Sequence, residues 1–369
     1  MKCRTFNAKA KASFQKRYES LGRKWELLSG KFVEDLLFDI GMTCEYYNPV
    51  HSFMIDCDDK WLASKFAAEE WKEICEGWPE ATISAGTSGY IESFADVDTL
   101  VGLEKALCVR PEGLEERLVH RCLEDGLFIY SDDPSPFLIA ERLSEAFWQR
   151  EAWGVASKLA MGHVNCKMLP GDMAGVESKE RQNRIQANKG PSNGRARIGK
   201  KGDLFWRSFD EPQRDWAVVE AAKAWNAYKD KYIIESTTKL PRQLHDILIH
   251  RTRELGNVDP LRTIAVPGLV MGGPVIQLLC LCWGCGGVNV TRFKRGEAGR
   301  LESSVDMLGM SLSAIYTLLT FRATVSNLME RYHLERKKTQ RKARLQRFGV
   351  KLLAESEGEL PLDLLHSSP

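Results

Sequence analysis

Hydrophobic and polar positions follow a helical period through most of the first 134 residues. Apolar residues recur three and four positions apart over residues 31–40, 61–78 and 114–127, which predicts three helices. Between the first two, residues 50–56 have an extended pattern, and we expect a short strand there. The pattern therefore predicts an α-rich region over residues 1–134.

After a proline-containing breaker at residues 132–136, the pattern becomes mixed. An aromatic helix is predicted over residues 136–161, and two short strands are predicted over residues 199–207 and 215–223. Residues 240–255 are amphipathic with helical spacing, which predicts a helix that covers one face of a sheet. This alternation of strands and helices is typical of an α/β core.

The apolar run at residues 264–285 is long enough to span a membrane. Pro267, Gly268 and Pro274 interrupt it and divide it into two pieces of strand length. We therefore expect a pair of buried strands and no membrane partner, although a transmembrane helix is the alternative. A further strand is predicted over residues 288–294.

A long C-terminal helix is predicted over residues 303–353, apolar in its first half and basic in its second. Together these elements predict an α/β protein with an α-rich N-terminal region and a core over residues 135–353. Residues 171–202 are polar and predict a linker that is mobile or partly helical. The acidic, proline-bearing residues 354–369 predict a loose tail.

The composition permits one large or two ordinary domains, because the chain has 369 residues and 43% of them are hydrophobic. The formal charge is +2, so any polyanion-binding surface must come from local basic clusters. Ten cysteines without a framework spacing, and no apolar N-terminal segment, favour free thiols in a reducing compartment. We expect an intracellular protein, in the nucleus rather than the cytoplasm.

Two carboxylates occupy corresponding points of the strand pair predicted at residues 199–223. Asp203 lies in the first strand and Glu220 in the second, and Lys223 follows. Mg²⁺ or Mn²⁺ prefers oxygen ligands of this kind, and a bound ion polarises a phosphoryl oxygen and activates water. The three side chains therefore predict a metal site that acts on a phosphodiester. The alternative is structural: Asp203 as a turn residue and Glu220 as an exposed strand position.

The order helix, strand, strand with Asp, strand with Glu, helix, strand resembles that of the PD-(D/E)XK nuclease-like proteins. The phrases Val33-Glu-Asp-Leu-Leu-Phe, Val50-His-Ser-Phe-Met-Ile-Asp, Gly199-Lys-Lys-Gly-Asp-Leu and Glu220-Ala-Ala-Lys also resemble those of a group of uncharacterised fungal proteins. The resemblance implies a restriction-endonuclease-like core with a mixed central sheet. It also implies a carboxylate from an upstream helix, for which Glu145 is the candidate, with Glu141 behind it.

The chain departs from the family motif at the lysine. The family has Glu-x-Lys, which places both side chains on one face of a strand, whereas this chain has Glu-x-x-Lys. In a regular strand Lys223 points away from Glu220. A bulge, an early end to the strand, or a lysine from elsewhere would restore the site. Lys200 and Lys201 are the substitutes that the sequence offers.

Two basic clusters are candidates for contacts with nucleic acid, DNA rather than RNA. The first contains Arg195, Arg197, Lys200 and Lys201, and the second contains Arg336, Lys337, Lys338, Arg341 and Lys342. A solvated basic helix and a nuclear-import signal are alternatives for the second cluster.

The sequence thus predicts a diverged Mg²⁺- or Mn²⁺-dependent nuclease-like protein that acts on or binds nucleic acid, with a possible link to a mobile element. The alternative is a catalytically inactive scaffold that binds DNA or protein partners through the same fold. No Gly-x-Ser-x-Gly, Walker or Rossmann motif occurs, so the common hydrolase, NTPase and dehydrogenase classes lack support.

Overall fold

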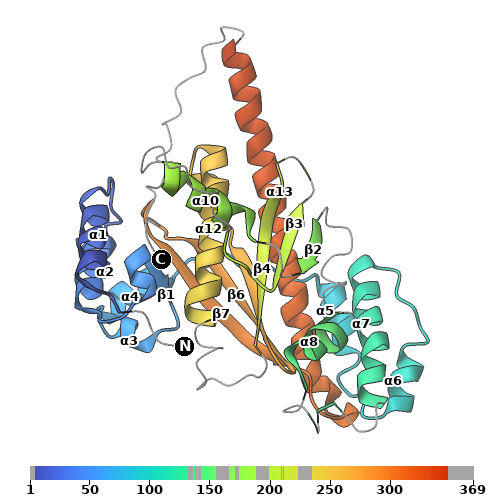
Figure 1. The fold of residues 1–369 in the computed structure, drawn as a ribbon. Coiled ribbons are helices and arrows are strands. Elements are labelled where there is room, and N and C mark those ends of the chain that lie inside the picture. The colour runs from blue at the N-terminus through green and yellow to red at the C-terminus, as the bar shows by residue number, and fades with distance from the viewer. Residues whose placement is uncertain are drawn as a thin grey trace.

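The computed structural model describes residues 5–131, 136–137, 139, 143–154, 166–170, 174–187, 199–208, 210, 212–222 and 235–347. A seven-stranded mixed sheet forms the centre, in the order β1-β7-β6-β5-β4-β3-β2 (Figure 1). Its strands are β1 (Met54–Asp56), β2 (Cys166–Pro170), β3 (Leu204–Ser208), β4 (Arg214–Ala222), β5 (Val266–Gly272), β6 (Val275–Trp283) and β7 (Thr291–Arg300). The pairs β1–β7 and β4–β5 are parallel, and the other pairs are antiparallel.

Helices surround this sheet in three groups. The N-terminal group is α1 (Ala8–Glu19), α2 (Val33–Thr43), α3 (Lys60–Ala63) and α4 (Ala68–Cys75). The second group is α5 (Ala85–Glu92), α6 (Leu100–Ala106) and α7 (Leu114–Ser131). The sheet is covered by α10 (Val176–Ala187), α12 (Leu240–Leu255) and α13 (Leu308–Arg347), and α8 (Glu145–Phe147) is a short turn followed by a π-helical segment, Trp148–Ala152.

Several predicted elements are confirmed. The helix over residues 240–255 is α12, with Gly256 in the left-handed conformation (φ 73°) at its C-terminal end. The apolar run at residues 264–285 forms the antiparallel strands β5 and β6, which are joined at Gly273 and Pro274. Both strands are buried along nearly their whole length.

Other boundaries differ from the predictions. The helix predicted over residues 61–78 is two helices, α3 and α4, separated by a turn after Ala63. The strand predicted over residues 288–294 begins at Thr291 and continues to Arg300. The helix predicted over residues 136–161 is wrong as a continuous element, because its described part is helical only over residues 145–154. Residues 155–165 lie outside the described part.

The predicted linker at residues 171–202 contains the helix α10, and the predicted N-terminal region contributes β1 to the edge of the central sheet. The predicted tail at residues 354–369 lies outside the described residues. Among the helices that the structure describes, the segment Val305–Leu345 is the one long and apolar enough to cross a membrane by length and composition. Of its most apolar window, 61% is buried inside the protein, as in a core helix.

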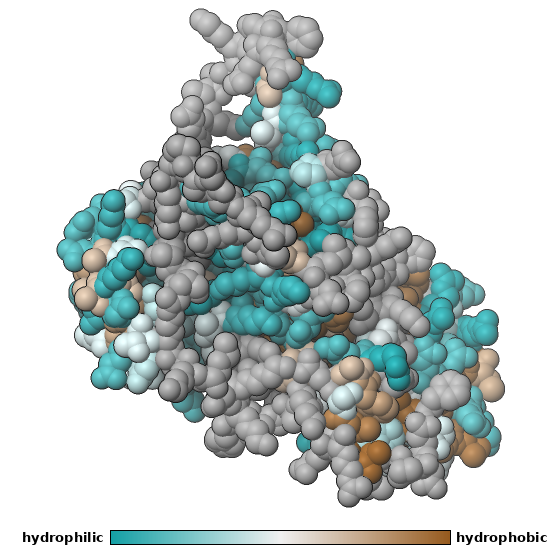
Figure 2. All heavy atoms as spheres, in the orientation of Figure 1, coloured by the Kyte–Doolittle hydropathy of each residue, from teal (hydrophilic) through white to brown (hydrophobic). Residues whose placement is uncertain are grey.

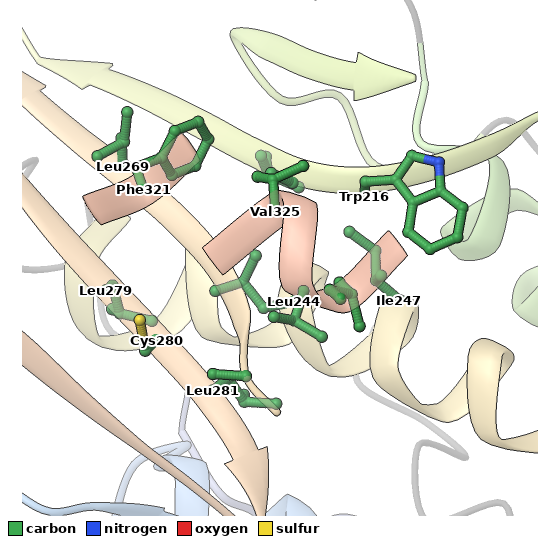
Figure 3. Close-up of a cluster of buried hydrophobic side chains, with 14 of the residues drawn as sticks. Trp216, Leu244, Ile247, Leu269, Leu279, Cys280, Leu281, Phe321 and Val325 are labelled. Carbon is green, nitrogen blue, oxygen red and sulfur yellow. The ribbon is translucent and has the colours of Figure 1, made fainter. Parts of the chain in front are cut away.

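The main core lies between the sheet and the two long helices α12 and α13. Leu244 and Ile247 of α12, Leu279 of β6, and Phe321 and Val325 of α13 belong to it (Figure 3). On β3, Trp206 packs its ring against Phe321 of α13, while the adjacent Phe205 faces the other way. The face that carries Phe205 is covered by α10 and α12, and it is the face that bears the charged residues described next.

Two smaller cores hold the helical groups. The first joins α1, α2 and α4 around Phe14, Leu37 and Phe53. The second joins α5, α6 and α7 to the first turns of α13, through residues such as Leu103 and Leu312. Beyond these contacts, the C-terminal part of α13 projects past the sheet, and its described surface is hydrophilic (Figures 1 and 2).

Candidate functional site

A β-bulge in β4 brings charged residues at both ends of the strand to one face of the sheet. Phe205 pairs with Val218 and Arg207 pairs with Asp215, so Trp216 is the additional residue on β4. Side chains two positions apart on a strand share a face, so Phe205 and Arg207 face the same side, and so do their partners. Asp215 therefore faces the same side as Val218 in spite of the odd spacing between them.

The other end of this face carries the two predicted carboxylates. The last pair of the β3–β4 ladder is Leu204 with Val219, so by continuation of the register Asp203 lies opposite Glu220. Asp203 lies in the bend just before β3, and its Oδ2 accepts a hydrogen bond of 2.7 Å from the backbone N–H of Ala221. The register thus brings the backbones of the two predicted acidic residues to neighbouring positions at the ends of β3 and β4.

Two glycines explain how the chain enters β3 at this point. A Cβ on Gly199 would lie 2.5 Å from the carbonyl oxygen of Gly175 and 2.8 Å from the backbone nitrogen of Lys179. A Cβ on Gly202 would lie 2.9 Å from Phe205 and 3.1 Å from the Nε2 atom of Gln243 on α12. The glycines therefore allow this segment to pass close to both α10 and α12, which fixes the position of Asp203.

Glu220 is fully buried and forms an ion pair with Lys239. Lys239 is the last residue of a π-helical turn, Glu235–Lys239, and immediately precedes α12. The Lys239 side chain is 32% exposed, so the buried carboxylate is paired with a partly solvent-accessible side chain. A lysine therefore reaches the glutamate from the entrance of the following helix.

Only some of the other residues predicted for the site lie in the part of the chain that the structure describes. Lys223, Arg195, Arg197 and Glu141 lie outside the described residues. Glu145 is the first residue of α8, and its side chain also lies outside the described part. Lys200 and Lys201 lie three and two positions before Asp203. Lys201 is exposed, and its backbone forms an isolated antiparallel β-bridge with Ala174.

Lys200 belongs to a group of cations that includes Lys239, the ion-pair partner of Glu220. Burial, and after it the neighbouring Arg242, lower the pKa of the Lys200 ammonium to about 8. Arg181 and Lys239 act in the same direction, whereas Asp246 opposes them. The pKa of Asp246, an α12 carboxylate, is itself raised by burial in spite of an ion pair with Arg181, whose Nε lies 2.8 Å from Oδ1.

We call Asp203, Glu220, Lys239, Lys200, Arg181, Arg242 and Asp246 the candidate site. Gln243 lies beside it on α12 and is 3% exposed. Its Oε1 and Nε2 atoms have no hydrogen-bond partner among the described residues. A buried amide in this state costs free energy, so it is a suitable contact for a polar ligand group.

The opposite end of the same face has a different character. Arg207 donates to both carboxylate oxygens of Asp215, at 2.6 and 3.2 Å, and both side chains are buried. Arg251, which is fully buried, forms ion pairs with Glu177 and with Glu254. Glu254 also accepts hydrogen bonds from Arg214 at 2.9 Å and from the Tyr332 hydroxyl of α13 at 2.8 Å. We call Arg207, Arg214, Arg251, Asp215, Glu177 and Glu254 the structural charge cluster.

The second basic cluster predicted from the sequence lies on the projecting part of α13. Lys337, Lys338, Arg341 and Lys342 are exposed there, and Arg336 is partly buried. Lys338 forms an ion pair of 2.8 Å with Glu335 in the same helix. The cluster is thus separate from the candidate site and is presented on a helix surface (Figure 2).

The donor set of the candidate site fits Mg²⁺ in a limited sense. Among the residues that the structure describes, no group of three or more His, Cys, Asp or Glu side chains is arranged to hold a metal ion. Mg²⁺ is commonly held by one or two carboxylates, with waters and substrate phosphates as the remaining ligands. Asp203 and Glu220, at the ends of β3 and β4, are the two carboxylates that would supply such ligands in the candidate site.

Comparison with protein-family models, with curated proteins and with solved structures found no match for this chain. Function is therefore inferred from the geometry of the chain's own residues.

Proposed function

We propose that the protein is a diverged metal-dependent nuclease-like protein that acts on nucleic acid, DNA rather than RNA, at the candidate site. The observation that carries this proposal is the buried Glu220, paired with Lys239 and opposite Asp203 at the ends of adjacent strands. Carboxylates and an ammonium group in this arrangement are suited to phosphodiester chemistry.

The order of elements supports a PD-(D/E)XK-like core. The short helix α8 is followed by β2, by β3 with Asp203 at its start, by β4 with Glu220, by α12 and by β5. This is the order that the resemblance implies, with α10 as an addition between β2 and β3. The strands β4 and β5 are parallel, and α12 provides the crossover between them.

Each residue of the candidate site has a role in this proposal. A bound Mg²⁺ or Mn²⁺ ion would polarise a phosphoryl oxygen and lower the pKa of water. Asp203 and Glu220 would hold that ion. Lys239 takes the role that the family motif gives to the strand lysine, because its ammonium group contacts Glu220 and its side chain is 32% exposed.

The surrounding cations would hold the substrate. Lys200, Arg181 and Arg242 come from three different segments, and Arg181, Arg242 and Lys239 all lie near enough to Lys200 to lower its pKa. Guanidinium and ammonium groups bind phosphate oxygens with charge-assisted hydrogen bonds. A second positive surface, on α13, would contact the sugar–phosphate backbone of the nucleic acid at a distance from the reacting phosphate.

The test is cleavage of supercoiled plasmid DNA in the presence of Mg²⁺ or Mn²⁺. We expect the wild-type protein to nick DNA and Asp203→Asn and Glu220→Gln to abolish nicking. Glu297→Gln, which changes an exposed carboxylate on β7, is the matched control and should retain activity. Metal-independent nicking, or full activity in both site variants, would contradict the proposal.

A second candidate function is a scaffold that binds nucleic acid without cleaving it. It is favoured by the engagement of both carboxylates within the protein, Asp203 with the Ala221 N–H and Glu220 with Lys239. Equal DNA binding by wild type, Asp203→Asn and Glu220→Gln, with no cleavage by any of them, would identify this function instead.

A further inference from the structure

The residues that lead into β3 are fixed against the first turn of α10. The backbone N–H of Lys200 donates to the Ser178 hydroxyl at 3.0 Å, and the Lys200 carbonyl oxygen accepts from the backbone N–H of Gly175 at 3.0 Å. Lys200 lies three positions before Asp203, so their Cα atoms are at most about 11 Å apart. A lysine with a fixed backbone thus stands close to the candidate carboxylates.

A second cation comes from α10 itself. Arg181 lies one turn after Ser178, so the two side chains share a side of the helix. The Nε atom of Arg181 lies 2.8 Å from Oδ1 of Asp246 on α12, and the Arg181 side chain is 10% exposed. Arg181 is therefore fixed between α10 and α12, on the side of α10 that contacts Lys200.

The entrance and first turns of α12 supply two more cations. Arg242 lies one turn after Lys239 and one turn before Asp246, so the three residues follow one side of the helix. After burial, these two cations and Arg181 lower the pKa of Lys200, whereas Asp246 raises it, so all of them lie near its ammonium group. We call Lys200, Arg181, Arg242 and Lys239 the cation group.

The cation group has more positive charge than its ion pairs neutralise. It contains two ion pairs, at Lys239 and at Arg181, and each pair is neutral as a whole. Lys200 and Arg242 add two further positive charges. An anion with two negative charges would therefore match the cation group, and its binding would relieve the repulsion between like charges.

A terminal phosphate of a nucleic-acid strand has this charge. An internal phosphodiester has one negative charge, whereas a phosphate monoester has about −1.5 to −2 at pH 7 and offers three oxygen acceptors. A guanidinium group binds two such oxygens at once, and an ammonium group can bind another. Gln243, next to Arg242, provides a neutral amide without a hydrogen-bond partner among the described residues.

We propose that Lys200, Arg181 and Arg242 bind the terminal phosphate of a DNA strand, so that the candidate site prefers phosphorylated strand ends to internal positions. This preference rests on the function proposed above, because it names the form of nucleic acid that the same site takes. Lys239 belongs to the cation group and contacts Glu220, so the terminal phosphate would lie beside the phosphodiester that is cleaved. A 5′ phosphate and a 3′ phosphate share this chemistry, and separate substrates distinguish them.

The first test measures DNA binding by the full chain in EDTA, where cleavage is not needed. Fluorescent duplexes of one sequence carry a 5′ phosphate, a 3′ phosphate or only hydroxyl groups at their ends, and binding is followed by fluorescence anisotropy. We expect one of the phosphorylated duplexes to bind at least about 10-fold more tightly than the hydroxyl-ended duplex, because charge-assisted hydrogen bonds are added. Equal affinity for all of the duplexes would overturn the proposal.

Variants separate recognition of the end from general attraction to DNA. In Lys200→Gln and in Arg242→Gln, the affinities for the phosphorylated and hydroxyl-ended duplexes should come within about 2-fold of each other. Lys337→Gln, which removes an exposed positive charge on α13, is the matched control and should keep the preference. A preference that survives in both folded site variants would show that other residues read the strand end and would overturn the proposal.

A competition with the wild-type protein covers the case in which a variant does not fold. Inorganic phosphate should displace the phosphorylated duplex at a concentration at which sodium chloride of equal ionic strength does not, and the hydroxyl-ended duplex should stay bound. Displacement of both duplexes to the same extent would be a general salt effect and would contradict a dedicated phosphate site.

Cleavage in Mn²⁺ distinguishes this proposal from the proposed function. Preferred binding of a phosphorylated end, with no cleavage of any DNA, would support the phosphate site and contradict the nuclease function. Cleavage of phosphorylated and hydroxyl-ended linear DNA at the same rate would support the nuclease function and overturn the preference for phosphorylated ends.

Discussion

The two ends of the β3–β4 face carry charged residues for different purposes. In the structural charge cluster, buried guanidinium groups are matched to carboxylates, as in the two-point contact between Arg207 and Asp215. In the candidate site, Glu220 pairs with Lys239 and Asp246 pairs with Arg181, and Lys200 lies close enough to Arg242, Arg181 and Lys239 for them to lower its pKa. The structural charge cluster has paired, largely buried charges, whereas the candidate site has positive charge near the partly exposed Lys239.

This difference distinguishes charged residues that stabilise the fold from charged residues that are available to bind a ligand. A buried ion pair is retained when each member would be costly without the other. A concentration of like charge lowers stability and is relieved by an anion. The pKa of Lys200, three positions before Asp203, is depressed first by burial and then by Arg242, Arg181 and Lys239.

The greatest predicted difference is in the free energy of unfolding of variants at two carboxylates of β4, Asp215 and Glu220. Asp215→Asn leaves the buried Arg207 without its counter-ion, and we expect it to lower the free energy of unfolding by about 3–5 kcal/mol. Glu220→Gln leaves Lys239, which is 32% exposed and can be solvated, so we expect a change of less than about 1 kcal/mol. Urea unfolding followed by tryptophan fluorescence measures both. Equal losses in the two variants would remove the distinction between the two ends.

The next effect concerns Lys239. We expect Lys239→Gln to lower the rate of metal-dependent cleavage by about 100- to 1000-fold, because a cation beside developing charge is removed. Lys239→Arg should recover part of the rate. Lys72→Gln, on the exposed surface of α4, controls for the loss of one positive charge and should have the wild-type rate. A wild-type rate in Lys239→Gln would assign the lysine role to another residue, such as Lys223.

A smaller effect is expected on the projecting part of α13. Replacement of Lys337, Lys338, Arg341 and Lys342 by Gln should weaken DNA binding and reduce the slope of log affinity against log salt by about 0.9 for each phosphate that the protein no longer neutralises. Cleavage at saturating DNA should be unchanged, because this surface is separate from the candidate site. An unchanged salt slope would mean that these residues form only a solvated helix surface.

The smallest effect is a pH dependence from Lys200. Because burial and the neighbouring Arg242 lower its pKa to about 8, Lys200 is a cation below that pH and becomes neutral above it. DNA affinity should therefore fall a few-fold as the pH rises through about 8. In Lys200→Arg, whose guanidinium stays charged, the affinity should be flat over the same interval. The same decline in both proteins would assign the titration to a different group.

Much of the framework is predictable from local patterns. The helix over residues 240–255 and the strands within residues 264–285 follow from helical spacing and from Pro and Gly breaks, and the structure confirms them. The opposition of Asp203 and Glu220 follows from the short connection between two adjacent strands. These features depend on residues close together in sequence, which is why the pattern contains them.

The rest depends on interactions that a linear pattern does not contain. Lys239 is nineteen positions from Glu220 and belongs to the turn before α12, so no strand motif points to it. Its signal is a basic residue at the entrance of the helix that follows the glutamate strand. The bulge at Trp216 is likewise absent from the predictions, and the position of α10 is predicted only as a linker that is mobile or partly helical. Both depend on long-range ion pairs such as Arg251 with Glu177.

Binding of Mn²⁺, followed by electron paramagnetic resonance, tests most directly whether the Glu220 end of the face is the functional one. The proteins compared are wild type, Glu220→Gln and Asp215→Asn, and each is first shown to be folded. If the Glu220 end is the functional one, Asp215→Asn should bind Mn²⁺ like wild type and Glu220→Gln should lose binding. Equal binding by wild type and Glu220→Gln, or no binding by wild type with or without DNA, would contradict the account.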